Sequence, residues 1–207
     1  MTGPVDVLEF WFADSLTNSD TLAERRSIWF MGGSNVDQLI TKKFGTLPDA
    51  ALAGELQHWT TDTRNALALV LVLDQFPRNI YRNTARAYHY DSAGLDLALK
   101  IIDQSLNLDL HPIEQSFLFL PLQHSEAIDD QTQAVRLYEI LTTQSSDAYL
   151  EGAKNSLDYA KRHRDIILRF GRFPHRNAIL GRDSTESEIE FLATGGDTFG
   201  VVPSQNP

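Results

Sequence analysis

Cysteine is absent from the 207 residues, which excludes disulfides, thiolate metal sites and cysteine nucleophiles and fits a reducing compartment. Long apolar runs are also lacking. The longest one, at residues 66–73, has eight residues, whereas a membrane span needs about 20. Residues 1–9 have neither the basic nor the apolar region of a signal peptide. We therefore expect a cytoplasmic protein with no membrane role.

Positive charge is scarce, since 18 Lys and Arg face 28 Asp and Glu and the net charge is −10. This balance argues against nucleic acid or acidic lipid as a partner. The basic residues are unevenly placed, however, because residues 161–182 hold seven Lys or Arg and one acid. This basic island is a candidate anion site, although its helical part can equally be a solvated face whose charges pair elsewhere.

Strand-like alternation is scarce as well, and helical periodicity dominates. The pattern predicts a single all-α domain over residues 1–195, built from stacked antiparallel helix pairs. Residues 196–207 are rich in Gly, Pro, Ser and Asn and are predicted to form a flexible tail. A helix starting at Thr63 is expected to stop at the first Phe-Pro, and one starting at Pro112 to continue towards Asp129 with a kink at Pro121.

One short phrase occurs twice, as Phe76-Pro77-Arg78-Asn79 and as Phe173-Pro174-His175-Arg176-Asn177, and a further arginine follows each copy, Arg82 and Arg182. Because proline lacks an N–H and disfavours helix in the residue before it, both copies are predicted to end a helix. Arg offers a planar fork of donors suited to carboxylate or phosphate, and Asn adds a donor and an acceptor. We interpret the two loops as walls of one polar pocket.

Two histidines are predicted to lie on apolar helix faces. A helical wheel places His163 among the apolar residues of 159–170. If residues 117–135 form one helix, His124 also lies among apolar residues. A buried histidine can be a structural group bonded to a carbonyl or an acid, or it can be a general acid or base tuned by burial. The sequence leaves both interpretations open, also for His175 in the second phrase.

Metal and cofactor motifs are not found. His124 and Glu126 lie two residues apart, about 200° around a helix, and cannot share an ion. His163 and His175 could meet only through the loop. Neither H-E-x-x-H nor a phosphate-binding glycine motif occurs. No metal ligand set and no cofactor are predicted.

The candidate site combines these observations. Asp74 stands near a predicted helix C-terminus, where negative charge is unfavourable, so we expect an arginine partner for it. The candidate acid or base groups are His124, His163 and His175. The candidate ligand-binding residues are Asp74, Gln75, Arg78, Asn79, Arg82, Glu126, Arg172, Arg176, Asn177 and Arg182.

Two functions fit these residues. The first is binding, with or without conversion, of a small anionic molecule that carries a phosphate or carboxylate. The second is a helical scaffold for a peptide or protein partner, in which the Arg-Asn loops only satisfy helix-end carbonyls. Replacing Arg176 separates them, because the first predicts lost ligand binding and the second mainly predicts lost stability.

Long phrases of the chain resemble those of the bacterial domain-of-unknown-function family 924. They are Leu8-Glu9-Phe10-Trp11-Phe12 and residues 73–82, 119–126 and 170–177. The resemblance covers nearly the whole chain and implies an all-α fold similar to tetratricopeptide-repeat proteins, with no particular activity. Asn83 stands where a glycine is expected in many relatives, and this departure bears on the local turn.

Overall fold

The computed structural model describes residues 2–201, and within them every regular element is helical. The predicted all-α class is therefore confirmed. Of the predicted flexible tail, residues 202–207 lie outside the described residues. The α-helices are α1 (Pro4–Phe12), α2 (Leu22–Arg26), α3 (Ser34–Phe44), α4 (Leu47–Leu52), α5 (Thr63–Ile80), α6 (Asp91–Asp103), α7 (Pro112–Leu118), α8 (Leu120–His124), α9 (Ile128–Gln144), α10 (Asp147–Phe170) and α11 (Glu186–Ala193).

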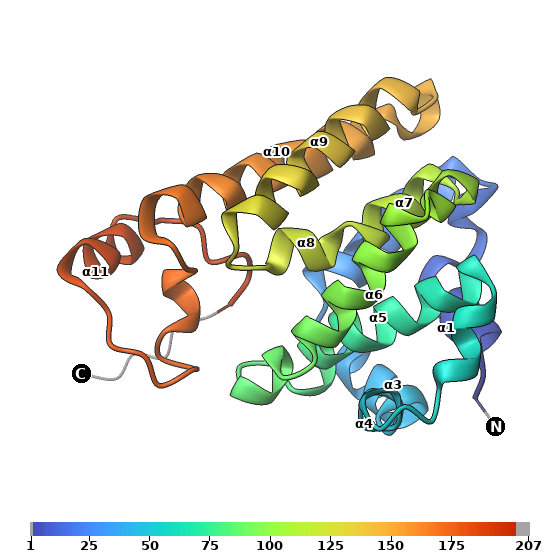
Figure 1. The fold of residues 1–207 in the computed structure, drawn as a ribbon, viewed down its shortest axis with the longest axis horizontal. Coiled ribbons are helices and arrows are strands. Elements are labelled where there is room, and N and C mark those ends of the chain that lie inside the picture. Colours follow the sequence, from blue (N-terminus) through green and yellow to red (C-terminus); the bar gives the residue numbers. More distant parts are fainter. Residues whose placement is uncertain (1, 202–207) are drawn as a thin grey trace.

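Helix α5 is the centre of the core, and α1, α3, α4 and α6 pack around it (Figure 1). Asp62 caps its start, with Oδ1 accepting from the Asn65 N–H at 3.0 Å. The apolar run at residues 66–73 is buried throughout, which explains why its sequence shows no polar face. Aromatic rings of α1, α5 and α7 meet beside it, with Trp11 5.6 Å from both Phe76 and Phe117.

Pro77 does not end α5, contrary to the prediction, because the helix continues to Ile80. A proline inside a helix costs about 3 kcal/mol. Tertiary contacts on both sides of Pro77 offset this cost: the Phe76 ring is fully buried, Arg78 pairs with Asp91, and Asn79 donates to Asp37. Asn83 then turns the chain with a φ of 60°, a conformation that Asn tolerates better than most residues.

The predicted helix from Pro112 to Asp129 is also wrong, because α8 ends at His124 and α9 starts at Ile128. The cause is a side chain of the next helix. Gln131 Nε2 donates to the carbonyls of Gln123 at 2.7 Å and Ser125 at 2.6 Å, which satisfies backbone groups at the end of α8. His124 therefore stands at a helix C-terminus, not in the middle of an apolar face.

Helices α9 and α10 form a long pair that lies side by side across one edge of the molecule (Figure 1). Only Ser145 and Ser146 connect them, so they run antiparallel, which is compatible with the tetratricopeptide-like expectation. Helix α10 ends at Phe170 with Gly171 in the left-handed conformation, φ 71°.

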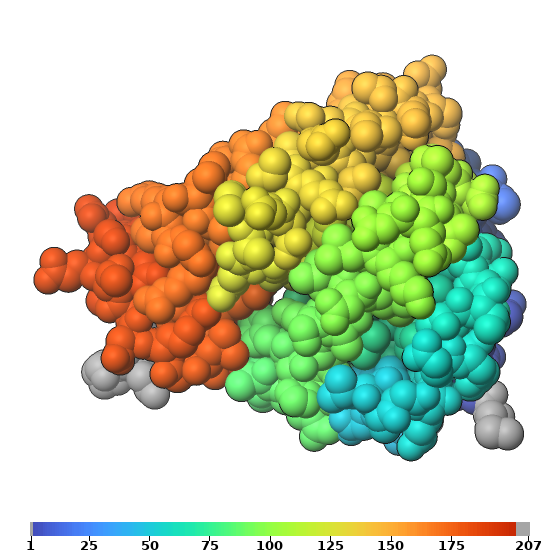
Figure 2. Space-filling model, viewed as in Figure 1, coloured from blue at the N-terminus to red at the C-terminus, as the bar shows by residue number. Residues whose placement is uncertain are grey.

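The chain after Gly171 forms a smaller layer, in which Phe173 packs with Ile166 and Ile167 of α10 in a separate apolar cluster. Thr185 caps α11, where it forms a capping box with Glu188. Figure 2 shows this C-terminal part (orange to red) in contact with the middle of the chain (green). Within the described residues, no helix combines the length and apolar character needed to cross a membrane.

Candidate functional site

A large cavity of about 1110 Å³ lies between α5, α7, α8 and α10. The segment around Trp29 and Phe30 and residues 196–200 complete its wall. Each helix contributes one face at helical spacing. The lining includes Gln75, Arg78 and Asn79 on α5 and Arg82 just after it, Ile113, Phe117, Leu120 and His124 on α7 and α8, and Tyr149, Ala153, Ser156 and His163 on α10.

A smaller cavity of about 130 Å³ shares part of this lining. Both cavities are bordered by Arg78, Arg82, His124, His163 and Phe199. Among the described residues, the smaller cavity is lined by three arginines and three histidines and by no carboxylate; the groups are Arg78, Arg82, Arg176, His124, His163 and His175. Its lining is therefore cationic or basic, as an anion site requires.

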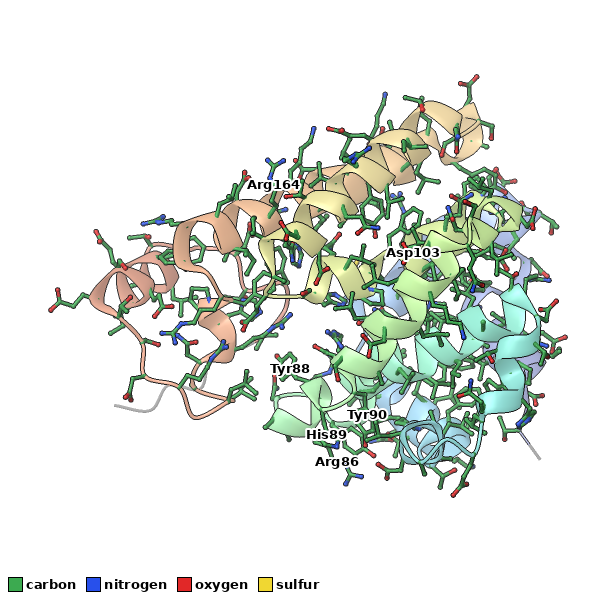
Figure 3. The ribbon with its side chains drawn as sticks, in the orientation of Figure 1. Arg86, Tyr88, His89, Tyr90, Asp103 and Arg164 are labelled. Carbon is green, nitrogen blue, oxygen red and sulfur yellow. The ribbon has the colours of Figure 1, made fainter. Side chains whose placement is uncertain are left out.

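The two Arg-Asn phrases converge through Arg78 and Arg176. Arg78 donates to both oxygens of Asp91, at 2.9 and 3.1 Å, and Arg176 Nη1 lies 4.0 Å from Asp91 Oδ2. Both guanidinium groups also face the Tyr88 ring, at 5.9 Å for Arg78 and 4.9 Å for Arg176. Figure 3 shows Tyr88 on the side of its segment that faces the C-terminal part, while Arg86 points away from it.

Arg176 is a buried cation with incomplete compensation. The residue is 7% exposed, and its Nη1 donates to the His124 carbonyl at 3.0 Å. Its buried Nε has no hydrogen-bond partner. Burial, and then the neighbouring charge of Arg78, lower the pKa of Arg176. Because a buried charge is costly unless it is paired, this guanidinium has capacity for an anion.

Asp74 and His124 form a buried pair beside this group. Asp74 is 1% exposed. His124 Nδ1 lies 2.8 Å from Asp74 Oδ1, and since a carboxylate only accepts, Nδ1 carries the proton. Burial would raise the pKa of Asp74, but the charge of Arg78 and the hydrogen bonds from His124 and Gln75 hold it below its ordinary value. Arg78 Nη1 lies 3.6 Å from Asp74 Oδ1, so the expected arginine partner is present.

The geometry of this pair leaves His124 Nε2 as the basic nitrogen in the wall of both cavities. Burial, together with Arg78, lowers the pKa of His124, so the ring is neutral near pH 7. A carboxylate that fixes the tautomer of a neutral imidazole is the arrangement used in general acid–base chemistry.

The other two candidate histidines border the same cavity. His163 Nδ1 donates to the Tyr159 carbonyl at 2.7 Å, and burial lowers its pKa well below the ordinary value. Burial lowers the pKa of His175 to about 3, and its buried Nδ1 has no partner. The His163 and His124 ring centroids are 6.2 Å apart.

Arg82 and Asn79 border the large cavity but have an internal partner. Arg82 donates to both oxygens of Asp37 at 2.7 Å, and Asn79 Nδ2 donates to Asp37 Oδ1 at 2.8 Å. Gln75 Nε2 in turn donates to the Asp74 carboxylate. These three side chains are thus held by carboxylates of the protein itself.

The remaining candidates form a second network outside both cavities. Arg182 donates to both oxygens of Glu126, at 2.7 and 3.0 Å. Arg172 donates to both oxygens of Glu188, at 2.7 and 2.8 Å. Asn177 lies between them, accepting from Arg182 and donating to Glu188. The structure thus brings Arg172, Asn177, Arg182 and Glu126 together where they hold the C-terminal part in place.

Three residues near the smaller cavity are not among the sequence-based candidates. Asp91 has a helix-cap pattern in the sequence, yet it pairs with Arg78. Tyr88 and Phe199 carry no motif, and the Phe199 ring stacks on His163 with centroids 3.5 Å apart. No local signal identifies them, because each meets the site through contacts between segments distant in sequence.

The described part of the chain offers no set of ligands for a metal ion. Within residues 2–201 no group of three or more His, Cys, Asp or Glu side chains is placed to hold an ion. The site is therefore described by its arginines, histidines and the Asp74 carboxylate.

Comparison with known proteins gives a family and one similar solved structure. The family described as bacterial protein of unknown function (DUF924) matches residues 7–196. The solved structure, a protein of unknown function, ATU0120, from Agrobacterium tumefaciens, has 32% sequence identity and a TM-score of 0.78, over 93% of this chain and 97% of that one. No protein with a curated description matches. The chain belongs to the DUF924 family of bacterial proteins.

Proposed function

We propose that the protein binds a small anionic molecule, bearing a phosphate or a carboxylate, in the smaller cavity. The observation that carries the proposal is Arg176, a buried cation with an unpartnered Nε, in a wall without carboxylates. An oxyanion in this cavity would add an acceptor and a negative charge beside the Arg176 guanidinium, whose nearest carboxylate oxygen is Asp91 Oδ2 at 4.0 Å. Arg78 and His175 border the same space and would complete the contacts.

His124 is the proposed acid or base of the site. Its proton on Nδ1 is fixed by Asp74, and its Nε2 is left for a group bound in the cavity. Two-dimensional 1H–15N spectra of the histidine side chains test this contact. On addition of inorganic phosphate the His124 Nε2 resonance is expected to shift, whereas the resonances of exposed His58 stay unchanged. An unshifted His124 alongside measured phosphate binding would remove it from the proposal.

One feature of the same residues supports the scaffold alternative. Arg78, Arg82, Arg172 and Arg182 each make two hydrogen bonds to an internal carboxylate. For these four arginines a structural role is sufficient, and a peptide or protein partner would then be bound elsewhere on the helical surface. The two functions make opposite predictions for Arg176.

The test compares Arg176→Gln with Arg164→Ala by calorimetric titration with inorganic phosphate and with acetate. Gln is shorter and neutral but still carries an N–H donor, so the substitution removes the guanidinium charge while keeping a polar side chain. We expect at least tenfold weaker binding in Arg176→Gln. Arg164 is a surface arginine that pairs with neighbouring Asp165 and borders neither cavity, so Arg164→Ala is expected to bind like the parent.

Thermal denaturation of the same variants separates the two roles. If Arg176 serves a ligand, removing an incompletely paired buried charge leaves the melting temperature of the free protein unchanged or raises it. If Arg176 is structural, the melting temperature falls by several degrees. A lowered melting temperature, with phosphate binding either absent from the parent or equal in parent and variant, would contradict the anion site.

A further inference from the structure

The large cavity changes character along its length. Ile113, Phe117, Leu120 and His124 follow one another on the face of α7 and α8 that lines it, so an apolar surface leads to a histidine. On α10 the lining runs from Tyr149 to His163, a distance of roughly 21 Å at 1.5 Å per residue. One end of the cavity is therefore polar and joins the proposed anion site, and the other end is remote from it.

The remote end is lined by aromatic and aliphatic side chains. Trp29 and Phe117 lie with ring centroids 4.9 Å apart, and Phe30 stacks parallel to Phe117 at 6.0 Å. Leu22, Ile113 and Leu120 complete this part of the lining. Trp29 cannot offer its indole N–H to a ligand, because Nε1 donates to the Trp11 carbonyl at 2.8 Å.

Most hydroxyl groups in the wall of the large cavity are already used. Five of them donate to a backbone carbonyl of the protein: Ser116 to Ile113, Tyr138 to Ser116, Ser145 to Leu141, Tyr149 to Leu16 and Ser156 to Gly152. A hydroxyl that has given its only proton presents mostly carbon surface and a weak acceptor. The composition of the wall thus overstates its capacity to bind a polar molecule.

Apolar side chains are also exposed at this end. Phe30 is 62% exposed and Met31 is 78% exposed, and both line the cavity. They belong to a single π-helical turn, Ser27–Met31, a form often found at functional sites. Arg26 stands near them beside Gly152, and because it is only partly buried it can remain hydrated.

We infer that the ligand is amphipathic, with an anionic head at Arg176 and Arg78 and a hydrocarbon body lying against Leu120, Phe117 and Phe30. This inference rests on the proposed function, since the head occupies the anion site proposed above. Phosphate monoesters and carboxylates share the required chemistry of the head. The body is a saturated chain or an aromatic group, because the wall it meets has few free hydrogen-bonding groups.

The experiment is a titration with two homologous series, methyl to octyl phosphate and acetate to octanoate, below the micelle concentration of each compound. Transfer of one methylene from water to an apolar site is worth about a fourfold gain in affinity. We expect affinity to rise by about that factor per methylene until the chain fills the apolar end. The head group is identified by the series that binds more tightly and whose affinity rises more steeply with chain length.

Two substitutions at the apolar end provide the structural test. Phe30→Gln and Leu120→Gln are expected to weaken octyl phosphate about tenfold and to leave methyl phosphate unchanged, because the head does not touch them. Leu168→Gln is the matched control, since Leu168 is 63% exposed on α10 and lines neither cavity. Arg176→Gln should weaken every member of both series by a similar factor.

The outcomes distinguish the two proposals. Methyl phosphate binding that depends on Arg176 but shows no gain with chain length would overturn the hydrocarbon body and leave the anion site intact. Tighter binding of glucose 6-phosphate than of octyl phosphate, or of octanedioate than of octanoate, would also overturn it. Octyl phosphate binding that is insensitive to Arg176→Gln would overturn the placement of the head, and with it the anion site.

Discussion

The three histidines of the site make the folded chain sensitive to acid. Each has a lowered pKa in the folded state, caused first by burial. In the unfolded chain a histidine titrates near 6.5. As the pH falls below 6.5, the unfolded state takes up more protons than the folded state, so stability is lost, at about 1.4 kcal/mol per pH unit for each histidine that stays neutral.

For His175 this loss continues until the pH reaches its folded pKa of about 3. Urea denaturation between pH 7 and pH 5 measures the slope of the free energy of unfolding against pH. His175→Gln is expected to lower the slope by about 1.4 kcal/mol per pH unit below pH 6, whereas the same substitution at exposed His58 has no such effect. Equal slopes in both variants would show that His175 is protonated in the folded state.

Asp74 is expected to be the most important single carboxylate of the site for stability. It is fully buried, accepts from Gln75 and His124 and lies beside Arg78. Removing one partner of a buried charge leaves the other uncompensated, which costs about 3–5 kcal/mol. Chemical denaturation should show this loss in the free energy of unfolding of Asp74→Asn. The control is Asp103→Asn at an exposed residue labelled in Figure 3, whose free energy of unfolding should change by less than about 0.5 kcal/mol. Equal effects would mean that Asp74 is protonated in the folded protein.

At the scale of elements, the closest helix contact near the site is between α5 and α6. Gly94 is buried, and a Cβ at this position would lie 3.4 Å from Leu73 Cβ and 3.8 Å from Asp74 Cβ. These are ordinary contact distances, so Gly94→Ala fits, and its gain in helix propensity of about 1 kcal/mol offsets any crowding. A larger side chain has no room and would push α6 away from Asp74.

Gly94→Leu is therefore expected to be less stable than Gly94→Ala by about 2–3 kcal/mol, the usual cost of overpacking a core. Denaturant unfolding of the two variants measures the difference. Because α6 carries Asp91 at its start, Gly94→Leu should also weaken phosphate binding, while Gly94→Ala should not. Equal stability of the two variants would show that the helices separate easily.

At the scale of the whole molecule, Glu126 joins the C-terminal part to the body. It lies between α8 and α9, accepts the Phe173 N–H at 2.8 Å, and receives two bonds from Arg182. Burial would raise the pKa of Glu126, but the bonds from Arg182 and Phe173 hold it below its ordinary value. The position of Arg176 against α8 depends on this joint.

Glu126→Gln is expected to cost about 2–3 kcal/mol, since it replaces charge-assisted hydrogen bonds. Hydrogen exchange should become faster in residues 171–193 and remain slow in α5, because only the C-terminal part is released. The matched control is Glu139→Gln, which removes a surface ion pair in which Lys161 Nζ lies 3.7 Å from Glu139 Oε1. It should lower the free energy of unfolding by less than about 1 kcal/mol. Uniformly faster exchange would mean that the two parts unfold together.

How far the sequence predicts the site depends on the range of each interaction. The repeated phrase identifies Arg78 and Arg176, and the fold brings them to one place. The same phrase also points to Arg82, Asn177 and Arg182, and the basic island points to Arg172, but the donors of all four bind internal carboxylates. Which arginine of the phrase keeps a free donor depends on where Asp37, Glu126 and Glu188 lie, and residue type and spacing do not contain that information.

By itself the sequence determined the all-α class, the family and most helix boundaries, since periodicity, Asp62, Gly171 and the Thr185–Glu188 box act over a few residues. Tertiary structure decided the rest. It carried α5 through Pro77, because long-range contacts outweigh a local cost, and it ended α8 at His124, because Gln131 reaches back from the next helix. It also built the two cavities, whose walls come from segments more than a hundred residues apart and are held by packing that no local pattern records.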